Sequence, residues 1–354
     1  MKIAIVAITR RGAELARQLG GELLEVQVYL PRRFYQEDNW HYFSEPLAEL
    51  LPRLFARAEQ LVCVMATGIV VRLLACHLRG KEYDPGVVVL DESGNFAISL
   101  LSGHLGGANR MAQELAEIIG GQAVITTATD VNNLPAWDQV ARDAGLGVQP
   151  VSHLRTLNRL LLEGETIALV DRKRLIANKF IDVPGVELYD SFADAIHSDA
   201  PGRVFVTNRY LPNMENRTAL LAIRPPDLVL GLGCNRGTSA DEIEAVVKSC
   251  LPQAFLAFAS IGLIATINAK RDEAGINEFA ERHKLQVVHF PAEQLNQVVV
   301  PSPPSEHALD AVGAKGVCEP AAILGARGGQ LLIRKQKSGN VTMAVAEIRD
   351  FKVL

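Results

Sequence analysis

The first part of the chain alternates short apolar runs with segments of helical periodicity. Residues 2–9 are mostly small and β-branched apolar residues, which favours a strand. Residues 13–19 show helical spacing that Gly20-Gly21 is expected to end. The alternation predicts further strands at 24–30, 61–66, 87–90, 96–101 and 123–127, and helices at 46–60 and 108–119. Strands that alternate with helices predict a layered α/β domain with a largely parallel sheet.

The pattern weakens after residue 150 and returns after Pro225-Pro226. A helix at 153–162 and strands at 166–170 and 203–207 are expected between these points, with polar loops around them. The two prolines remove backbone donors and restrict the residues before them, which places a boundary there. We therefore expect an N-terminal α/β domain (1–150), a less regular middle segment (151–225) and a C-terminal α/β domain (226–354).

The C-terminal part repeats the α/β rhythm. Strands are expected at 227–234 and 286–290, and a closing hairpin at 330–348 around Ser338-Gly339-Asn340. A helix is expected at 239–251, because Ser239 is a natural N-cap and Glu242, three residues on, completes a capping box. The expected fold class is therefore two α/β domains with largely parallel sheets, joined by the middle segment.

Composition excludes several classes of partner. The 354 residues carry a formal net charge of −4, so no overall basic field exists for nucleic acid or an anionic membrane. No apolar run reaches the ~20 residues of a membrane span. The five cysteines are odd in number and none has CxxC spacing, which argues against a disulfide framework and a thiolate zinc site. We expect reduced thiols, a cytoplasmic location and no protein-bound metal.

A glycine-rich turn, Ser102-Gly-His-Leu-Gly-Gly107, joins a predicted strand to a predicted helix. Its glycines allow the backbone to approach a ligand, and the helix start offers unpaired N–H groups and the positive end of the helix dipole. Such a turn suits a carboxylate or a developing oxyanion. The candidate substrate contacts are Ser102, Gly103, Gly106, Gly107 and Asn109. Tight strand–helix packing without a ligand is the alternative.

A second glycine-rich turn follows the strand at 227–234. Its candidate contacts are Gly231, Gly233, Arg236, Gly237 and Thr238. The spacing G-x-G-x-x-x-G departs from the dinucleotide fingerprint, and no acidic residue stands about 20 positions later. The absence of a Walker lysine motif also argues against a nucleotide enzyme. Binding of an anion beside Arg236 remains the functional hypothesis for this turn.

Three further segments hold candidate polar groups. Thr67, Gly68 and Arg72 follow a predicted strand, and Arg72 could clamp a carboxylate or simply be solvated. Thr126–Asp130 closes another strand and could cap the next helix or line a site. Glu319 stands just ahead of a helix that proline opens at its first position, as a cap or a catalytic acid.

His104 is the most specific single candidate for a catalytic residue. A histidine in a glycine turn at a strand end is usually accessible, and its ordinary pKa of ~6.5 suits general-base catalysis near neutral pH. A structural histidine bonded to a carbonyl is the alternative, and Glu92 and Glu319 are the other candidate catalytic groups. If His104 is the base, activity should fall as pH falls through its pKa.

Several motifs, taken in order, carry a resemblance to a known family. They are Ala66-Thr-Gly-Ile-Val-Val-Arg72, Asp91-Glu-Ser-Gly-Asn95, Ile98-Ser-Leu-Leu-Ser-Gly-His-Leu-Gly-Gly-Ala-Asn109, Ile125-Thr-Thr-Ala-Thr-Asp-Val131, Gly231-Leu-Gly-Cys-Asn-Arg-Gly-Thr238, Ala259-Ser260, Asp272-Glu273 and Gly316-Val-Cys-Glu-Pro-Ala-Ala322. This ordered set resembles the cobalt-precorrin-5A hydrolase family, also called CbiG. Residues 261–270 depart from it by being longer and more apolar before Lys270.

The resemblance implies a reaction and a substrate. Water would open the δ-lactone of cobalt-precorrin-5A, and acetaldehyde would leave to give cobalt-precorrin-5B, in anaerobic cobalamin biosynthesis. Cobalt would belong to the substrate, so no cofactor is expected. Arg72, Arg110 and Arg236 would meet the substrate's carboxylates, in a cleft that both glycine turns face. Contact with other corrinoid-pathway enzymes would be transient. A non-catalytic corrinoid-binding protein is the alternative.

Overall fold

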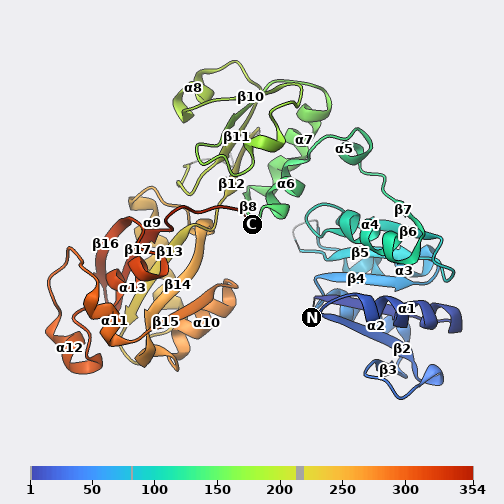
Figure 1. Ribbon diagram of the computed structural model, residues 1–354, viewed down its shortest axis with the longest axis horizontal. Helices are drawn as coiled ribbons and strands as arrows, with labels where there is room; N and C mark the ends of the chain where they lie inside the picture. Colours follow the sequence, from blue (N-terminus) through green and yellow to red (C-terminus); the bar gives the residue numbers. More distant parts are fainter. Residues whose placement is uncertain (1, 81–82, 213–218, 354) are drawn as a thin grey trace. The chain divides into compact units, whose positions relative to one another are not determined.

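The computed structural model describes residues 2–80, 83–212 and 219–353. The chain divides into two compact units, residues 1–142 with 161–163, and residues 143–160 with 164–354. Within the described ranges the strands form three sheets, each with helices packed on it (Figure 1). The predicted α/β class with mostly parallel sheets is confirmed, and the middle segment, expected to be less regular, holds a sheet of its own.

The first unit is built on a seven-stranded sheet in the order β3-β2-β1-β4-β5-β6-β7. Its strands are β1 (Ile3–Ala7), β2 (Val26–Pro31), β3 (His41–Phe43), β4 (Gln60–Val64), β5 (Gly86–Leu90), β6 (Phe96–Leu101) and β7 (Gln122–Val124). Its helices are α1 (Arg10–Glu22), α2 (Leu47–Phe55), α3 (Thr67–Leu74), α4 (Ala108–Ile119), α5 (Ala128–Val131) and α6 (Trp137–Asp143).

Strand β6 runs against its neighbour β5, whereas the other paired strands of this sheet are parallel. Val87 pairs with Leu101 and Leu90 with Ala97, so β6 ends where β5 begins. The glycine turn after β6 therefore leaves the sheet at the edge where β4 and β5 start. Helix α3 follows β4 and begins at the opposite edge, about 16 Å away for a five-residue strand.

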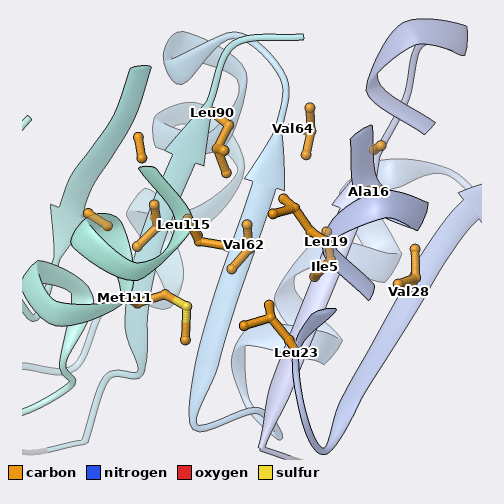
Figure 2. Packing of buried hydrophobic residues seen from close by; sticks show 14 of the residues in the cluster. Ile5, Ala16, Leu19, Leu23, Val28, Val62, Val64, Leu90, Met111 and Leu115 are labelled. Carbon is orange, nitrogen blue, oxygen red and sulfur yellow. The ribbon is translucent and has the colours of Figure 1, made fainter. Parts of the chain in front are cut away.

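Apolar side chains cover both faces of this sheet. Helices α1 and α4 pack on one face and α2 and α3 on the other. Figure 2 shows Leu19 of α1 and Leu115 of α4 against the sheet residues Ile5 and Val62. The prediction that α1 ends at Gly20-Gly21 is wrong. A Cβ on Gly20 would lie 2.6 Å from Cγ2 of Val28, so a glycine inside the helix lets it pack closely on β2.

The middle sheet has the order β10-β9-β11-β12-β8, and β8 is antiparallel to β12 while the other pairs are parallel. Its elements are β8 (Gly147–Gln149), α7 (Leu154–Leu162), β9 (Ile167–Val170), β10 (Val186–Leu188), α8 (Phe192–His197), β11 (Gly202–Val206) and β12 (Leu220–Arg224). Strands as short as β8 and β10 span too few residues for a periodic pattern, which is why the sequence indicated only part of this sheet.

The C-terminal sheet has the order β15-β14-β13-β17-β16. Its elements are β13 (Leu228–Cys234), α9 (Ala240–Gln253), β14 (Ile261–Ile267), α10 (Ala274–Arg282), β15 (Gln286–Phe290), α11 (Ala292–Gln297), α12 (Glu306–Val312), α13 (Cys318–Gly325), β16 (Leu331–Ser338) and β17 (Val341–Glu347). The predicted closing hairpin is β16–β17. Helices α9 and α10 cover one face, and α11 and α13 the other. Within the described residues, no helix combines the length and apolar character that crossing a membrane requires.

Of the capping box predicted for α9, the Ser239 half is present, whereas the Glu242 carboxylate bonds another segment. Ser239 caps α9 as predicted, since its hydroxyl accepts a hydrogen bond from the Glu242 amide at 3.2 Å. The Glu242 carboxylate accepts the Asn340 amide at 2.9 Å and thereby ties the hairpin to α9. The apolar run that departs from the family pattern is β14, which pairs with β13 and β15 and needs apolar side chains on both faces.

Candidate functional site

His104 lies between two carboxylates in the first unit. Its Nε2 is 2.8 Å from Oδ2 of Asp130, and its Nδ1 is 3.3 Å from Oδ1 of Asp138. Asp130 belongs to α5 and Asp138 to α6, so three segments converge on one imidazole ring. The side chains of His104 and Asp138 are 8% and 5% exposed, and that of Asp130 is 18% exposed. Asp130 is therefore the most accessible member of this cluster.

The charge state of His104 follows from these neighbours. Burial by itself would lower the pKa of the ring, but the hydrogen bonds and negative charges of Asp138 and Asp130 outweigh it and raise the pKa. An imidazole with a carboxylate at each nitrogen donates from both, which requires the protonated form. The arrangement therefore favours a buried imidazolium, which can donate a proton but lacks a free nitrogen to accept one.

Asn109 organises the cluster from the start of α4. Its Nδ2 donates to Oδ2 of Asp130 at 3.0 Å and to the Thr127 hydroxyl at 3.1 Å, and its Oδ1 accepts the Ser99 hydroxyl at 2.6 Å. The side chain is buried. Asn109, predicted as a substrate contact, thus holds the Asp130 carboxylate in place.

The glycines of the first turn sit in close packing. A Cβ on Gly103 would lie 2.5 Å from Oδ1 of Asn109, and one on Gly106 would lie 2.6 Å from the Gly86 amide nitrogen. Gly107 has φ 78° and lies against the Arg142 guanidinium, which donates to the His104 carbonyl at 2.9 Å. The Gly107 amide also donates to that carbonyl. These contacts fit the packing alternative for the turn, which presents His104 to the two carboxylates.

The remaining candidates of the first unit lie away from His104. Thr67, Gly68 and Arg72 belong to α3, which begins at the opposite edge of the sheet. Arg72 is exposed and donates to the Gly68 carbonyl at 2.9 Å, as a solvated helix arginine does. Glu92 follows β5 at that same opposite edge and is exposed. The reversal of β6 is the physical reason that these groups do not join the cluster.

The second glycine turn already holds a carboxylate of the chain. Oε1 of Glu273 accepts the Gly237 amide at 2.7 Å, and its Oε2 lies 2.8 Å from Nζ of Lys270. Burial would raise the pKa of Glu273, but Lys270 and the Gly237 amide outweigh it and lower the pKa. The Thr238 hydroxyl donates to the Asn235 carbonyl at 2.8 Å. The Gly237 amide of this turn therefore already binds a carboxylate of the chain itself.

Gly231 and Gly233 allow two other elements to approach β13. A Cβ on Gly231 would lie 1.9 Å from the Cys318 carbonyl oxygen of α13, and one on Gly233 would lie 2.7 Å from the Thr342 hydroxyl of β17. Beside them a pocket of about 460 Å³ opens between the β13 turn, α12 and the β16–β17 hairpin. Gly233 and Arg236 line this pocket.

Glu319 is buried, with a side chain that bridges two segments. Its Oε1 accepts the Ser302 hydroxyl at 2.9 Å and the Lys335 amide at 2.9 Å, and its Oε2 accepts the Ser302 amide at 3.3 Å. The residue is 2% exposed. Glu319 thus ties the proline-rich turn and β16 to the start of α13, and these contacts favour a structural role over a catalytic one.

Sequence reasoning missed Asp138 and undervalued Asp130. Asp138 stands in the short helix α6 next to the buried Trp137, and nothing in its local sequence distinguishes it from a solvated helix carboxylate. The sequence left open whether Asp130 caps the next helix or lines a site. The signal that could have identified Asp130 is that the strand before it and the strand before His104 are neighbours in the sheet. A pattern read along one segment does not show which strands are neighbours.

Comparisons with known proteins match the chain in three consecutive regions. The matching family descriptions are "Cobalamin synthesis G N-terminal" over residues 49–130, "Cobalamin biosynthesis central region" over 135–225 and "Cobalamin synthesis G C-terminus" over 228–346. A cobalt-precorrin-5A hydrolase of Priestia megaterium is 35% identical and covers 98% of this chain and 94% of its own. One of Salmonella typhimurium is 30% identical over 97% of both chains. A probable cobalt-precorrin-5A hydrolase of Methanocaldococcus jannaschii is 25% identical over 98% of this chain and 99% of its own.

Proposed function

The chain belongs to the cobalt-precorrin-5A hydrolase family, and on that premise we propose that it hydrolyses the δ-lactone of cobalt-precorrin-5A. Acetaldehyde leaves and cobalt-precorrin-5B forms, as a step of anaerobic cobalamin biosynthesis. The observation that carries this proposal is the similarity to a hydrolase along nearly the whole of both chains. The same similarity favours the enzyme over a non-catalytic corrinoid-binding protein.

The proposed machinery is the cluster of Asp130, His104 and Asp138. Asp130 is the most accessible member, so it takes a proton from the water that attacks the lactone carbonyl. The tetrahedral oxyanion collapses, the C–O bond of the lactone breaks, and the Nε2 proton of His104 passes to the released alkoxide. Asp130 then returns its proton to His104 across their 2.8 Å hydrogen bond, which restores the starting state. A positioned acid or base contributes typically ~10²–10⁴ in rate.

This assignment changes the role suggested for His104 by the sequence. A general base needs an unprotonated nitrogen, and each ring nitrogen here lies beside a carboxylate. The proton-donor role uses the imidazolium that the two carboxylates stabilise. Asp138, the less exposed carboxylate, keeps the positive charge of the ring compensated when Asp130 is protonated.

Loss of acetaldehyde follows from the freed alcohol. Its hydroxyl proton leaves, the adjacent carbon–carbon bond breaks, and the electron pair passes into the conjugated macrocycle. Asp130 is suited to accept that proton because it is ionised again after the first step, and it then passes the proton to the macrocycle that has received the electron pair. Cobalt arrives with the substrate in this proposal, and the reaction uses no cofactor of the protein. The proposed setting is the cytoplasm, with transient contacts to enzymes that act before and after.

Anaerobic incubation with cobalt-precorrin-5A tests the proposal. The expected result is catalytic release of acetaldehyde, trapped as a hydrazone, in amounts that exceed the enzyme many times. A corrinoid carrier would instead bind one equivalent of the intermediate and release no acetaldehyde, and that outcome would overturn the proposal. The variant Asp130→Asn is expected to bind substrate and to lose turnover by about 10²–10⁴.

A further inference from the structure

The pocket of the C-terminal domain has an unusual balance of charge. Its described lining includes the cationic side chains of Arg236, Lys270, Lys335 and Lys337, and no aspartate or glutamate. The whole chain has more acidic than basic residues, 40 against 36. A concave surface lined by one sign of charge concentrates ligands of the opposite sign. The pocket is therefore suited to an anionic ligand despite the negative net charge of the protein.

Three of these four cations are more available to a ligand than the fourth, Lys270. Lys270 is 14% exposed on its side chain and pairs with Glu273 at 2.8 Å, so its charge is largely compensated within the protein. Arg236 and Lys337 are exposed and Lys335 is half-buried. Lys335 contributes its backbone amide to Glu319, which leaves that structural bond independent of its side chain.

Part of the pocket wall is apolar. Ile267 at the end of β14 and Val312 and Val317 near α12 and α13 line it together with the cations. An apolar wall with positive charges matches a ligand that has a flat apolar body and carboxylates on its periphery. The volume of about 460 Å³ falls within the ~300–1,000 Å³ typical of small-molecule pockets. A whole tetrapyrrole with its side chains is too large to be enclosed, so one edge would enter.

We propose that this pocket is a subsite for the peripheral carboxylates of a polycarboxylated tetrapyrrole, held by Arg236, Lys335 and Lys337. The identity of the ligand rests on the proposed function, whereas the preference for a polyanion rests on the lining alone. The subsite is one of binding, and no bond is made or broken in it. Lys335 and Lys337 were not indicated by the sequence, because both lie on the closing hairpin, far along the chain from the glycine turns.

Fluorescence titration with uroporphyrin, a porphyrin that carries eight carboxylates, tests this subsite on the full chain. The double variant K335A/K337A is expected to bind uroporphyrin about 2- to 30-fold more weakly than wild type, the range for loss of two ionic contacts that are open to solvent. Lys284→Ala removes an exposed lysine of the same domain outside the pocket and is the matched control. Affinity should also fall with added salt, which screens exposed charges.

Two further probes decide what the pocket recognises. A tetra(N-methylpyridyl)porphyrin has a similar ring but positive charges, and it should not bind. Tripolyphosphate should compete only weakly, because it lacks the apolar body. Any of three results would overturn the proposal. They are equal binding of the two porphyrins, strong competition by tripolyphosphate, and an unchanged uroporphyrin affinity in the double variant.

Acetaldehyde release separates this inference from the proposed function. If both hold, the double variant raises KM for cobalt-precorrin-5A and leaves kcat close to wild type, because the lysines bind substrate and take no part in the proton transfers. A wild type that releases acetaldehyde while the double variant keeps its KM contradicts the subsite alone. A wild type that releases none, yet binds uroporphyrin through the lysines, contradicts the proposed reaction alone.

Discussion

Nδ1 of His104 lies 3.3 Å from Oδ1 of Asp138, which places a buried carboxylate behind a ring that already meets Asp130 through Nε2. A charged imidazole taken out of water needs such compensation, since an unpaired buried charge costs several kcal/mol. Two carboxylates and one imidazolium leave a net charge of −1 in the cluster. This charge distribution determines how the site should respond to pH.

Removal of the His104 ring should abolish most of the activity. His104→Ala is expected to lose about 10²–10⁴ in turnover, the span of a positioned proton donor, with little change in substrate binding. His77→Ala, which removes an exposed histidine of the same unit, should behave as wild type. Steady-state rates of acetaldehyde release measure both variants. A variant that stays active and is only less stable would show that His104 is structural.

The pH profile shows whether His104 donates or accepts the proton. Because the donor is the imidazolium and its pKa is raised, wild-type activity should fall as pH rises through that pKa. A general base would produce the opposite limb, with activity lost as pH falls. Rates of acetaldehyde release across pH 5–10 distinguish the two, and a profile with only an acid limb would restore the base role suggested by the sequence.

Asp138→Asn should lower the pKa of His104 by removing one negative partner. The imidazolium stabilises the folded state fully below the unfolded histidine pKa of ~6.5, and this contribution is lost as pH rises through the higher folded value. The variant should therefore lose about 1–3 kcal/mol of unfolding free energy near pH 6 and less at pH 9. NMR titration of the ring and urea unfolding measure these effects. The exposed Asp143→Asn is the control, and an unchanged ring pKa would refute the coupling.

Glu319→Gln tests the structural role of the buried carboxylate. Its oxygens accept hydrogen bonds from Ser302 and the Lys335 amide, and a glutamine can replace only part of this set. We expect a loss of about 1–3 kcal/mol in unfolding free energy with kcat nearly unchanged. The exposed Glu306→Gln should change neither quantity. A normal stability with a large fall in kcat would make Glu319 catalytic.

Gly231→Ala tests whether Gly231 is needed for close packing of β13 or for contact with a ligand. The new Cβ would meet the Cys318 carbonyl oxygen, so the variant should lose about 1–3 kcal/mol of stability through overpacking of β13 against α13. Gly21→Ala, inside α1 with open space around it, should instead gain roughly 0.5–1 kcal/mol. Thermal unfolding compares the two. A stable Gly231→Ala variant with weakened substrate binding would favour a ligand contact.

The elements that could be predicted from the sequence are those with local causes. The hairpin around Gly339, the N-cap at Ser239 and the strand at 96–101 are where periodicity and capping chemistry place them. The ordered motifs were also sufficient to indicate the family. His104 was found because a histidine within a glycine turn is a local signal.

Which of the candidate groups come into contact depends on the long-range packing of the chain. The residues of a strand do not indicate whether it runs parallel or antiparallel to its neighbour. Because β6 runs antiparallel to β5, His104 lies at the opposite edge of the sheet from Arg72 and Glu92. Asp138 and Lys337 come from segments remote in the chain, so no local pattern connects them with a glycine turn. Glu273 occupies the Gly237 turn because folding brings the start of α10 to the end of β13. Strand direction, contacts between distant segments and internal competition for a hydrogen-bond donor are all properties of packing. For this reason no local pattern in the sequence predicts the carboxylates that surround His104.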